Sequence, residues 1–402
     1  MYIAGNGGTV RADASFTMNL GDGSEGNNKG AFGFVNVGQN NKIISNISNV
    51  ALQNNSVYIY SKDTSGTAVN PQIENNTDII ASGKNNYGIY SAGYVVNTGN
   101  MNLQSGTGNV GVYSIKGGTI ENRRRLDGTG GVITVGGSIP GEDEYGVGMA
   151  AGYSWTQKDL EKPLAQRPEE TTGNIINRGT INVNGKNSIG MYASGSKSTV
   201  ENATGATINL RGEGSMGIYL DNGATGTNNG TITTVGNPKG AVGLVVRNGS
   251  TLVNNGTISI DSQGGYGQFI TTGGIVRNYG TFHVGGGATK EFTPGNKPTG
   301  KAVLDAKGRP IVEIKAGPGA VTATIEANGK LVTPVVTNVS GKRISRHFEI
   351  LTDKSKFLFA SKDSGKILKI AREHLGNEKV VKLPTLIQTI GARIKGLFAK
   401  KS

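Results

Sequence analysis

Apolar and polar residues alternate along much of the chain, and the alternation recurs at a fixed interval. Between residues 177 and 284 the chain repeats a phrase in which Asn, Gly and Thr precede an apolar residue. The apolar residues that anchor this phrase lie 27, 24, 26 and 24 positions apart. They are Ile181, Ile208, Ile232, Ile258 and Phe282. An interval near two dozen residues predicts a solenoid, in which each repeat is one supersecondary unit that stacks on its neighbours.

The repeats predict strands rather than helices, because their apolar residues follow a period of two. Ile181 and Val183 show this spacing, as do Ile189 and Met191. Gly, Asn and Ser separate the runs, and these residues suit corners where the backbone needs a positive φ. One repeat has room for three short strands. We therefore predict an all-β fold, a right-handed parallel β-helix (β-solenoid) whose coils stack about 4.8 Å apart.

A second motif keeps the same interval and ends in tyrosine. It reads Ile-Gly-Met-Tyr at 189–192 and Met-Gly-Ile-Tyr at 216–219. If the apolar residues of the motif face the core, the tyrosines point outward and form an exposed aromatic stripe. The tyrosines of this predicted stripe are Tyr90, Tyr113, Tyr192 and Tyr219. Such a stripe could bind a sugar or a protein, but lateral ring stacking that only stiffens the sheet is the simpler explanation.

Asparagine also recurs at one turn of the repeat. The recurring residues are Asn97, Asn177, Asn228, Asn254 and Asn278. Identical side chains on successive coils can form a ladder of amide hydrogen bonds along the rod. We expect this ladder to be structural.

The strength of the repeat divides the chain into four parts. Residues 1–75 are predicted to be degenerate N-terminal coils, and residues 76–285 hold the regular repeats. Residues 286–341 contain a Gly- and Pro-marked connector and several short strands. We expect these strands to cap the last coil, because an open coil invites pairing at its edge. Residues 342–402 form a basic tail.

The regular interval slips between Gly111 and Gly190, which predicts two insertions that leave the rod, around 121–131 and 153–172. Insertions in solenoids form loops on one face, often the binding face. The partner-binding candidates in these loops are Trp155, Arg123, Arg124 and Arg125. The arginines could contact acidic glycans or nucleic acid, but three charges with no interleaved aromatic residues are a weak nucleic-acid footprint. A solvated loop explains them better.

Positive charge is concentrated at the C-terminal end. Residues 342–402 hold 15 Lys or Arg against 5 Asp or Glu, about ten of the 13 net positive charges of the 402-residue chain. Apolar residues recur at helical spacing in 363–375 and 384–401, so we expect two amphipathic helices. Basic amphipathic helices bind anionic membranes or partner grooves. The simpler explanation is that the two helices pack on each other or on the end of the rod. A third possibility is that the tail has an evolutionary origin separate from the solenoid.

The sequence shows no recognisable set of catalytic residues. It contains no cysteine, which excludes disulfides, thiolate metal ligands and thiol nucleophiles. The three histidines, His283, His347 and His374, have no metal-ligand spacing. Acidic clusters at 142–144 and 169–170 fall in loops, where solvated charge explains them better than a catalytic carboxyl pair. We therefore predict no enzyme activity, no cofactor and no metal.

The repeat phrases Asn-Arg-Gly-Thr-Ile-Asn-Val from Asn177 and Asn-Asn-Gly-Thr-Ile-Ser-Ile from Asn254 resemble the passenger repeats of type V autotransporter adhesins, particularly the large fusobacterial ones. The resemblance covers about residues 75–285, and the segment from Thr322 is similar to the region that follows such repeats. Gly- and Asn-rich β-helices of filamentous haemagglutinins and phage tail proteins are similar too. The resemblance therefore implies the passenger part of a secreted adhesin.

The resemblance further implies a rod on the bacterial cell surface, at the outer membrane, that presents loops and sheet faces to host or bacterial proteins or glycans. We expect a monomer without a nucleic-acid partner. The N-terminus lacks the basic segment and apolar core of a signal peptide. The 61-residue tail is too short for the family's translocating barrel, so membrane contact would need a missing barrel or the basic tail. A polysaccharide-binding or polysaccharide-cleaving β-helix, such as a phage tailspike, is the alternative.

Overall fold

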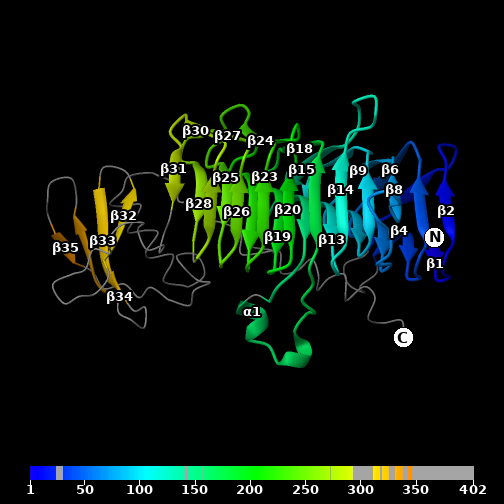
Figure 1. Ribbon diagram of the computed structural model, residues 1–402, viewed down its shortest axis with the longest axis horizontal. Helices are drawn as coiled ribbons and strands as arrows, with labels where there is room; N and C mark the ends of the chain where they lie inside the picture. Colours follow the sequence, from blue (N-terminus) through cyan, green and yellow to red (C-terminus); the bar gives the residue numbers. More distant parts are fainter. Residues whose placement is uncertain are drawn as a thin grey trace.

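The chain forms an all-β parallel solenoid of about ten coils, as the repeat predicts (Figure 1). Each coil contributes one strand to each of three parallel sheets, here called A, B and C, which hold 11, 10 and 10 strands. The computed structural model describes residues 1–23, 30–140, 144–155, 157–271, 273–292, 311–316, 319–325, 331–337 and 343–345.

Sheet A is built from the strands of the tyrosine motif. Its register pairs Tyr192 with Tyr219 and Met191 with Ile218, so equivalent residues of successive repeats lie directly above one another. Its strands are β1 (Tyr2–Ile3), β4 (Ala31–Asn36), β7 (Ser56–Ser61), β10 (Tyr87–Ser91), β13 (Val110–Ser114), β16 (Val147–Ala151), β19 (Ile189–Ser194), β22 (Met216–Asp221), β25 (Val242–Val246), β28 (Tyr266–Ile270) and β31 (Thr289–Phe292).

Sheet B follows sheet A within each coil, and from the third coil onward every strand has asparagine at its last position or next to it. Between the two sheets the chain turns through residues such as Asn222 and Asn248, whose φ angles are 53° and 50°. Its strands are β2 (Thr9–Ala12), β5 (Lys42–Ser45), β8 (Ile73–Asn75), β11 (Tyr94–Asn97), β14 (Thr119–Arg123), β17 (Asn174–Arg178), β20 (Thr199–Asn202), β23 (Thr225–Asn228), β26 (Thr251–Asn254) and β29 (Ile275–Asn278).

Sheet C carries the apolar anchors of the repeat. Its strands alternate between buried apolar residues and partly exposed polar residues, as in Thr-Ile-Asn-Val of β18. Its strands are β3 (Met18–Leu20), β6 (Asn49–Leu52), β9 (Asp78–Ala81), β12 (Met101–Thr107), β15 (Val132–Gly137), β18 (Thr180–Val183), β21 (Thr207–Leu210), β24 (Thr231–Thr234), β27 (Thr257–Asp261) and β30 (Thr281–Gly285).

The predicted column of isoleucines is confirmed and forms the centre of the core. The register pairs Ile181 with Ile208, Ile208 with Ile232, and Ile232 with Ile258. All four side chains are fully buried, and they share one hydrophobic cluster with residues of sheets A and B. Because backbone pairing runs from coil to coil, each coil buries its apolar face against its two neighbours.

The predicted asparagine ladder is also confirmed, at the corner between sheets B and C. Each side-chain amide nitrogen donates to the amide oxygen of the asparagine one coil further on, over 2.6 to 3.0 Å. The ladder consists of Asn75, Asn97, Asn122, Asn177, Asn202, Asn228, Asn254 and Asn278. Glycine follows at this corner because the coils stack closely: a Cβ on Gly256 would lie 2.0 Å from the carbonyl oxygen of Gly230.

Two segments leave the coil where the sequence interval slips. The shorter lies between β14 and β15, and the longer lies between Ala151 of β16 and Asn174 of β17. The longer insertion contains two helical turns, α1 (Gln157–Leu160) and the 3-10 turn η2 (Leu164–Gln166). Figure 1 shows it projecting from the side of the rod. An isolated bridge between Tyr153 and Thr171 closes its base.

Four strands beyond the solenoid form a separate antiparallel sheet. They are β32 (Ile311–Ala316), β33 (Gly319–Ile325), β34 (Leu331–Thr337) and β35 (Arg343–Ser345), paired in that order. The first three fall in the segment expected to cap the last coil, and β35 lies at the start of the predicted basic tail. The capping role stays a prediction. The predicted tail helices at 363–375 and 384–401 lie outside the described residues. Within the described part, no helix is long and apolar enough to span a membrane.

Candidate functional site

The tyrosines of the second motif form a column along sheet A, but this column is not exposed. Tyr90, Tyr113, Tyr192 and Tyr219 keep only 7%, 1%, 2% and 1% of their surface accessible. They belong to a hydrophobic cluster separate from the core, together with other residues on the outer face of the sheet. The prediction of an exposed aromatic stripe is therefore wrong: the rings leave the core, but the outer face of sheet A is covered.

The tyrosine rings pack against one another along the rod. The ring centroids of Tyr60 and Tyr90 lie 5.4 Å apart in a stacked pair, and those of Tyr90 and Tyr113 lie 4.9 Å apart edge to face. Tyr192 and Tyr219 form a tilted pair at 5.6 Å. These contacts match the alternative that the sequence left open, in which the rings stiffen the sheet.

The sequence did contain a signal for the covered face. In Ile-Gly-Met-Tyr of β19, apolar residues occupy the outward positions, Ile189 and Tyr192, as well as the inward position of Met191. Strands that are apolar on both faces are typical of sheets buried on both sides, whereas strict alternation is typical of sheets with one face in water. Sheet C shows that alternation and sheet A does not.

A buried ion pair that the sequence analysis missed lies where β22 and β25 end. The Nε of Arg247 lies 3.5 Å from Oδ1 of Asp221, and an Nη of Arg247 donates to the hydroxyl of Tyr219 at 3.0 Å. Asn248 donates to the same Asp221 oxygen at 2.6 Å. Burial raises the pKa of Asp221, and the opposing effect of the Arg247 cation is smaller. Asp221 ends β22 and Arg247 directly follows β25, one coil later, a spacing that could have revealed the pair.

The buried tyrosines predict a loss of stability at alkaline pH. Burial raises the pKa of Tyr219 from 10.0 to about 12, because the lowering effect of the nearby Arg247 is smaller. The stabilisation that this shift provides is complete below pH 10.0 and is lost as pH rises through about 12. Urea unfolding at increasing pH should therefore show falling stability in this window. The variant Tyr219→Phe should show a shallower fall, and an equal slope would contradict the assignment.

Two of the three arginines, Arg124 and Arg125, contact neighbouring coils, whereas Arg123 ends β14 and contacts a residue of its own strand. Arg123 lies 3.8 Å from Glu121, and an Nη of Arg124 donates to the hydroxyl of Thr180 at 3.0 Å. Arg125 donates to the backbone carbonyl of Asn76 at 3.0 Å and lies 3.6 Å from Asp78. Arg124 and Arg125 therefore hold the insertion onto the coils on both sides of it.

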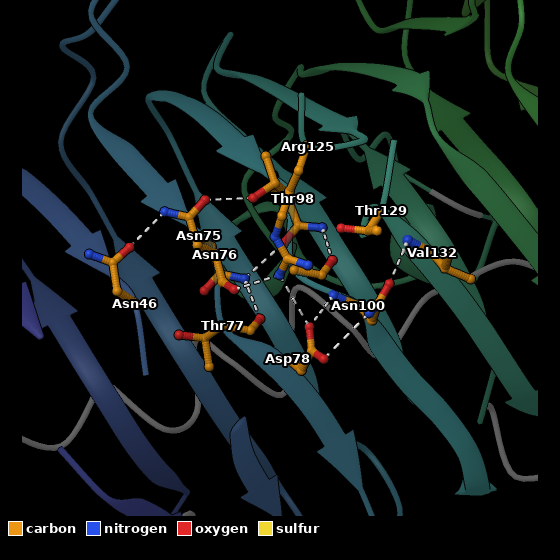
Figure 2. A network of polar contacts seen from close by, with 12 residues as sticks. Asn46, Asn75, Asn76, Thr77, Asp78, Thr98, Asn100, Arg125, Thr129 and Val132 are labelled. Atoms are coloured by element: carbon orange, nitrogen blue, oxygen red, sulfur yellow. Dashed lines mark hydrogen bonds and ion pairs between the residues drawn. The ribbon is translucent and has the colours of Figure 1, made fainter. Parts of the chain in front are cut away.

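Figure 2 shows how the Arg125 contact joins a wider polar network at the corner between sheets B and C. The Thr98 hydroxyl donates to the side-chain oxygen of Asn76 at 2.5 Å, and the Asn76 amide donates to Asn46 at 2.7 Å. The backbone of Asn100 donates to Asp78 at 2.8 Å. These contacts span four successive coils. They support a structural role for Arg125, and partner binding by the arginines stays a prediction.

Removing the Arg125 side chain should therefore change local order more than global stability. Exposed ion pairs contribute about 0–1 kcal/mol, so Arg125→Gln should lower the free energy of unfolding by no more than that. Hydrogen exchange at residues 124–131 should become faster, because the insertion loses its anchor on Asn76. Arg277→Gln is the control, because Arg277 is exposed on β29 and lies away from the insertion. A large loss of global stability in Arg125→Gln would contradict this prediction.

Trp155 helps to hold the longer insertion together. Its indole nitrogen donates to the carbonyl of Pro168 at 2.6 Å, and its backbone nitrogen donates to Glu170 at 2.9 Å. The guanidinium of Arg167 lies over its ring, 5.0 Å from the centroid. At the base of the insertion, the buried hydroxyl of Tyr153 donates to the buried carboxylate of Asp159. The insertion is thus a folded element, and Trp155 as a partner-binding residue stays a prediction.

Two leucines of the longer insertion remain open to solvent. Leu160 and Leu164 are 47% and 68% exposed, although the segment around them is internally cross-linked by hydrogen bonds. Exposed apolar residues on a fixed element are common features of protein-binding surfaces.

One acidic residue expected to be solvated is instead buried. Glu144 accepts a hydrogen bond from the Thr107 hydroxyl at 2.5 Å and lies 3.4 Å from Nζ of Lys84. Burial alone would raise the pKa of Glu144, but the Thr107 hydrogen bond and the Lys84 charge together bring it below its usual value. The residue clamps two earlier coils rather than solvating a loop. Glu142 and Asp143 lie outside the described residues.

The comparisons with known proteins agree with this fold. Residues 1–203 and 195–307 match the BigA third pectate lyase-like domain, and residues 320–394 match a domain of unknown function, DUF956. No curated protein and no solved structure matches the chain significantly. The two stretches of the first match overlap and together cover most of the solenoid and more than half of the chain. The chain therefore belongs to the family of the BigA third pectate lyase-like domain.

Proposed function

We propose that the chain is the passenger region of a secreted bacterial surface adhesin, a non-enzymatic rod that attaches through its longer insertion. The observation that carries this proposal is the shape of the insertion. It is a folded element that projects from an otherwise regular rod (Figure 1) and carries exposed Leu160 and Leu164. The autotransporter type, and its fusobacterial variety, rest on the resemblance of the repeats.

The internal contacts of the insertion suit it to binding another protein. A loop that is ordered before binding loses less conformational entropy when a partner arrives. The contacts of Trp155 with Pro168 and Arg167 provide this order. The exposed leucine side chains then become buried against the partner, which stabilises the complex by roughly 25 cal/mol per Å² of apolar surface removed from water. A protein surface with an apolar depression is the partner that fits best.

The carboxylates that the structure describes in polar networks support a non-enzymatic role. Asp221 is paired with Arg247, Glu144 with Lys84, and Glu121 accepts a hydrogen bond from Tyr94 at 2.5 Å. A glycoside hydrolase needs two carboxyl groups facing one substrate bond, one of them free to donate a proton. These three carboxylates are each held by neighbouring coils of the rod.

The attachment role is tested with two sets of variants in the full chain. Leu160→Asp combined with Leu164→Asp should reduce attachment of the protein to host or bacterial cells at least about tenfold, a loss of about 1.4 kcal/mol. Leu126→Asp is the matched control, because Leu126 is exposed on the shorter insertion. A chain in which a Gly-Ser linker replaces residues 155–169 should lose attachment while its circular dichroism keeps the β signature. Unchanged attachment in both variants would overturn the proposal.

The alternative from the sequence is a polysaccharide-binding or polysaccharide-cleaving β-helix, and the pectate lyase-like description of the family names a fold that can carry an enzyme. Incubation with neutral and acidic polysaccharides, followed by measurement of new chain ends, distinguishes the two functions. The native protein should produce no more new polysaccharide chain ends than a boiled sample of the same protein. Turnover that disappears in Asp221→Asn or Glu144→Gln would replace the adhesin proposal with an enzyme.

A further inference from the structure

A second row of side chains lies at the corner between sheets B and C, one residue after the asparagine ladder. Two residues of this row are asparagines followed by glycine, in the pairs 229–230 and 255–256. Asn255 is exposed and Asn229 is half-buried, although the ladder residues just before them are fully buried. The corner therefore presents two accessible Asn-Gly pairs on successive coils.

An Asn-Gly pair can react with itself, because glycine has no Cβ to hinder its nitrogen. The glycine nitrogen attacks Cγ of the asparagine side chain, and the bond between Cγ and the side-chain nitrogen breaks. Ammonia leaves with the proton of the glycine N–H, and a cyclic imide remains. Water then opens the imide at either carbonyl, which gives aspartate or isoaspartate. The reaction needs no enzyme and no reagent other than water.

The stacking of the coils requires glycine at both positions. A Cβ on Gly256 would lie 2.0 Å from the carbonyl oxygen of Gly230, and a Cβ on Gly230 would lie 2.4 Å from that of Ala206. Neither glycine can therefore be exchanged for a residue with a side chain while the coils keep their spacing. The close packing of this corner retains the residue that makes the preceding asparagine reactive.

The closed coil holds the reacting groups apart. The nitrogen of Gly256 donates to the carbonyl oxygen of Asn228 at 2.9 Å, and that of Gly230 donates to the carbonyl oxygen of Asn202 at 3.0 Å. The side-chain nitrogen of Asn255 donates to Oδ1 of Asn229 at 2.9 Å. The glycine nitrogen must lose its proton and turn toward Cγ before it can attack. These hydrogen bonds must therefore break first, which means that the coil must open.

We propose that Asn229 and Asn255 are sites of spontaneous deamidation that react only when their coil opens. The two sites differ in how often this happens. The coil after Asn255 is the last of sheets B and C, and its ladder residue Asn278 is exposed, unlike Asn228 and Asn254. Units at the end of a solenoid have fewer neighbours and open more readily than internal ones. Asn255 therefore reacts faster than Asn229.

The products weaken the corner at which they form. Aspartate at position 255 has no side-chain N–H to donate to Asn229. Aspartate at position 229 places a carboxylate beside Glu201, whose Oε1 lies 3.5 Å from Nδ2 of Asn229, and like charges at this distance repel. Isoaspartate at either position lengthens the main chain between two paired strands. A coil that has opened and reacted thus closes less well than before.

Peptide mass spectrometry of the full-length chain, incubated at neutral pH, tests the proposal. One sample stays in buffer, and the other is kept in enough urea to remove the β signature in circular dichroism. Both asparagines should react at similar rates in urea. In buffer both should react at least about tenfold more slowly, with Asn255 ahead of Asn229. Equal rates in buffer and urea would overturn the protection by the closed coil, and no product in urea would overturn the sites themselves.

Two cavity variants distinguish opening of one coil from unfolding of the whole rod. Ile258 is fully buried in the coil of Asn255, and Ile43 is fully buried in the second coil. Ile258→Ala should speed the reaction of Asn255 in buffer at least about threefold more than Ile43→Ala does, because the cavity weakens the coil that must open. Equal acceleration by the two variants would show that only global unfolding exposes the site, and would overturn the proposal.

Asn255→Tyr is the control that the repeat itself supplies, because Tyr279 holds the equivalent place on the next coil. This variant cannot react at position 255 and should keep the circular dichroism of the original chain. After long incubation in buffer, the original chain should unfold at lower urea concentration than a fresh sample. The variant should lose less stability over the same period. An equal loss in both proteins would contradict the link between deamidation and weakening of the corner.

Discussion

Replacing Ile208 with alanine should destabilise the solenoid by about 2–5 kcal/mol. Ile208 is fully buried between Ile181 and Ile232, and its Cγ2 would lie 2.9 Å from a Cβ on Gly190. The backbone of three paired coils fixes the surrounding walls, so the site cannot collapse to fill the cavity. Urea unfolding followed by circular dichroism measures the loss.

The matched control for Ile208→Ala is Ile80→Ala, because Ile80 is 45% exposed on the same sheet. Its loss of stability should be well below that of Ile208→Ala, since little surface is buried there. Equal losses in the two variants would mean that the isoleucine column does not carry the core.

Replacing Asn202 with alanine should break the asparagine ladder at its middle. Asn202 accepts from Asn177 at 3.0 Å and donates to Asn228 at 2.8 Å, and all three residues are fully buried. The variant leaves two buried amide groups without these partners, at about 1–3 kcal/mol each. Thermal unfolding and hydrogen exchange at the 202–230 corner should both report the loss.

Asn209→Ala is the control for the ladder. Asn209 donates to Asn182 at 2.9 Å in the same coil-to-coil manner, but both side chains lie on the half-exposed outer face of sheet C. Water can replace that hydrogen bond, so the expected loss is about 1 kcal/mol or less. If the two asparagine variants unfold alike, burial of the ladder does not matter to stability.

The period of the repeat was sufficient to predict the fold and the core. Identical residues at a 24-to-27-residue interval can lie above one another only if the chain winds once per interval, which fixes both the Ile208 column and the Asn202 ladder. The role of the outer face of sheet A was not predicted correctly. The interpretation of the tyrosine motif assumed that the outer face of every sheet is in contact with water. Ile189 contradicts that assumption, because it lies on the outer face of sheet A and is buried there.

The polar contacts of the insertions could not be predicted from the local sequence, because their partners lie on other coils. Arg125 contacts Asn76 and Asp78, and Glu144 contacts Lys84. These partners are one or two coils earlier, and the insertions themselves shift the register that would have aligned them. A run of charged residues is therefore an ambiguous signal in a solenoid, because the sequence of one repeat does not distinguish solvated charges from charges paired with another coil.

The coil-to-coil pairing of this rod also determines how it responds to force. Because every strand is held by the coil before it and the coil after it, tension on the two ends peels one coil at a time. Each coil of 24 to 27 residues releases roughly 80–95 Å of extended chain at about 3.3–3.6 Å per residue. A rod built this way lengthens in steps and dissipates mechanical work. In the proposed attachment role, a sudden pull would therefore extend the rod before it ruptured the bond at the longer insertion.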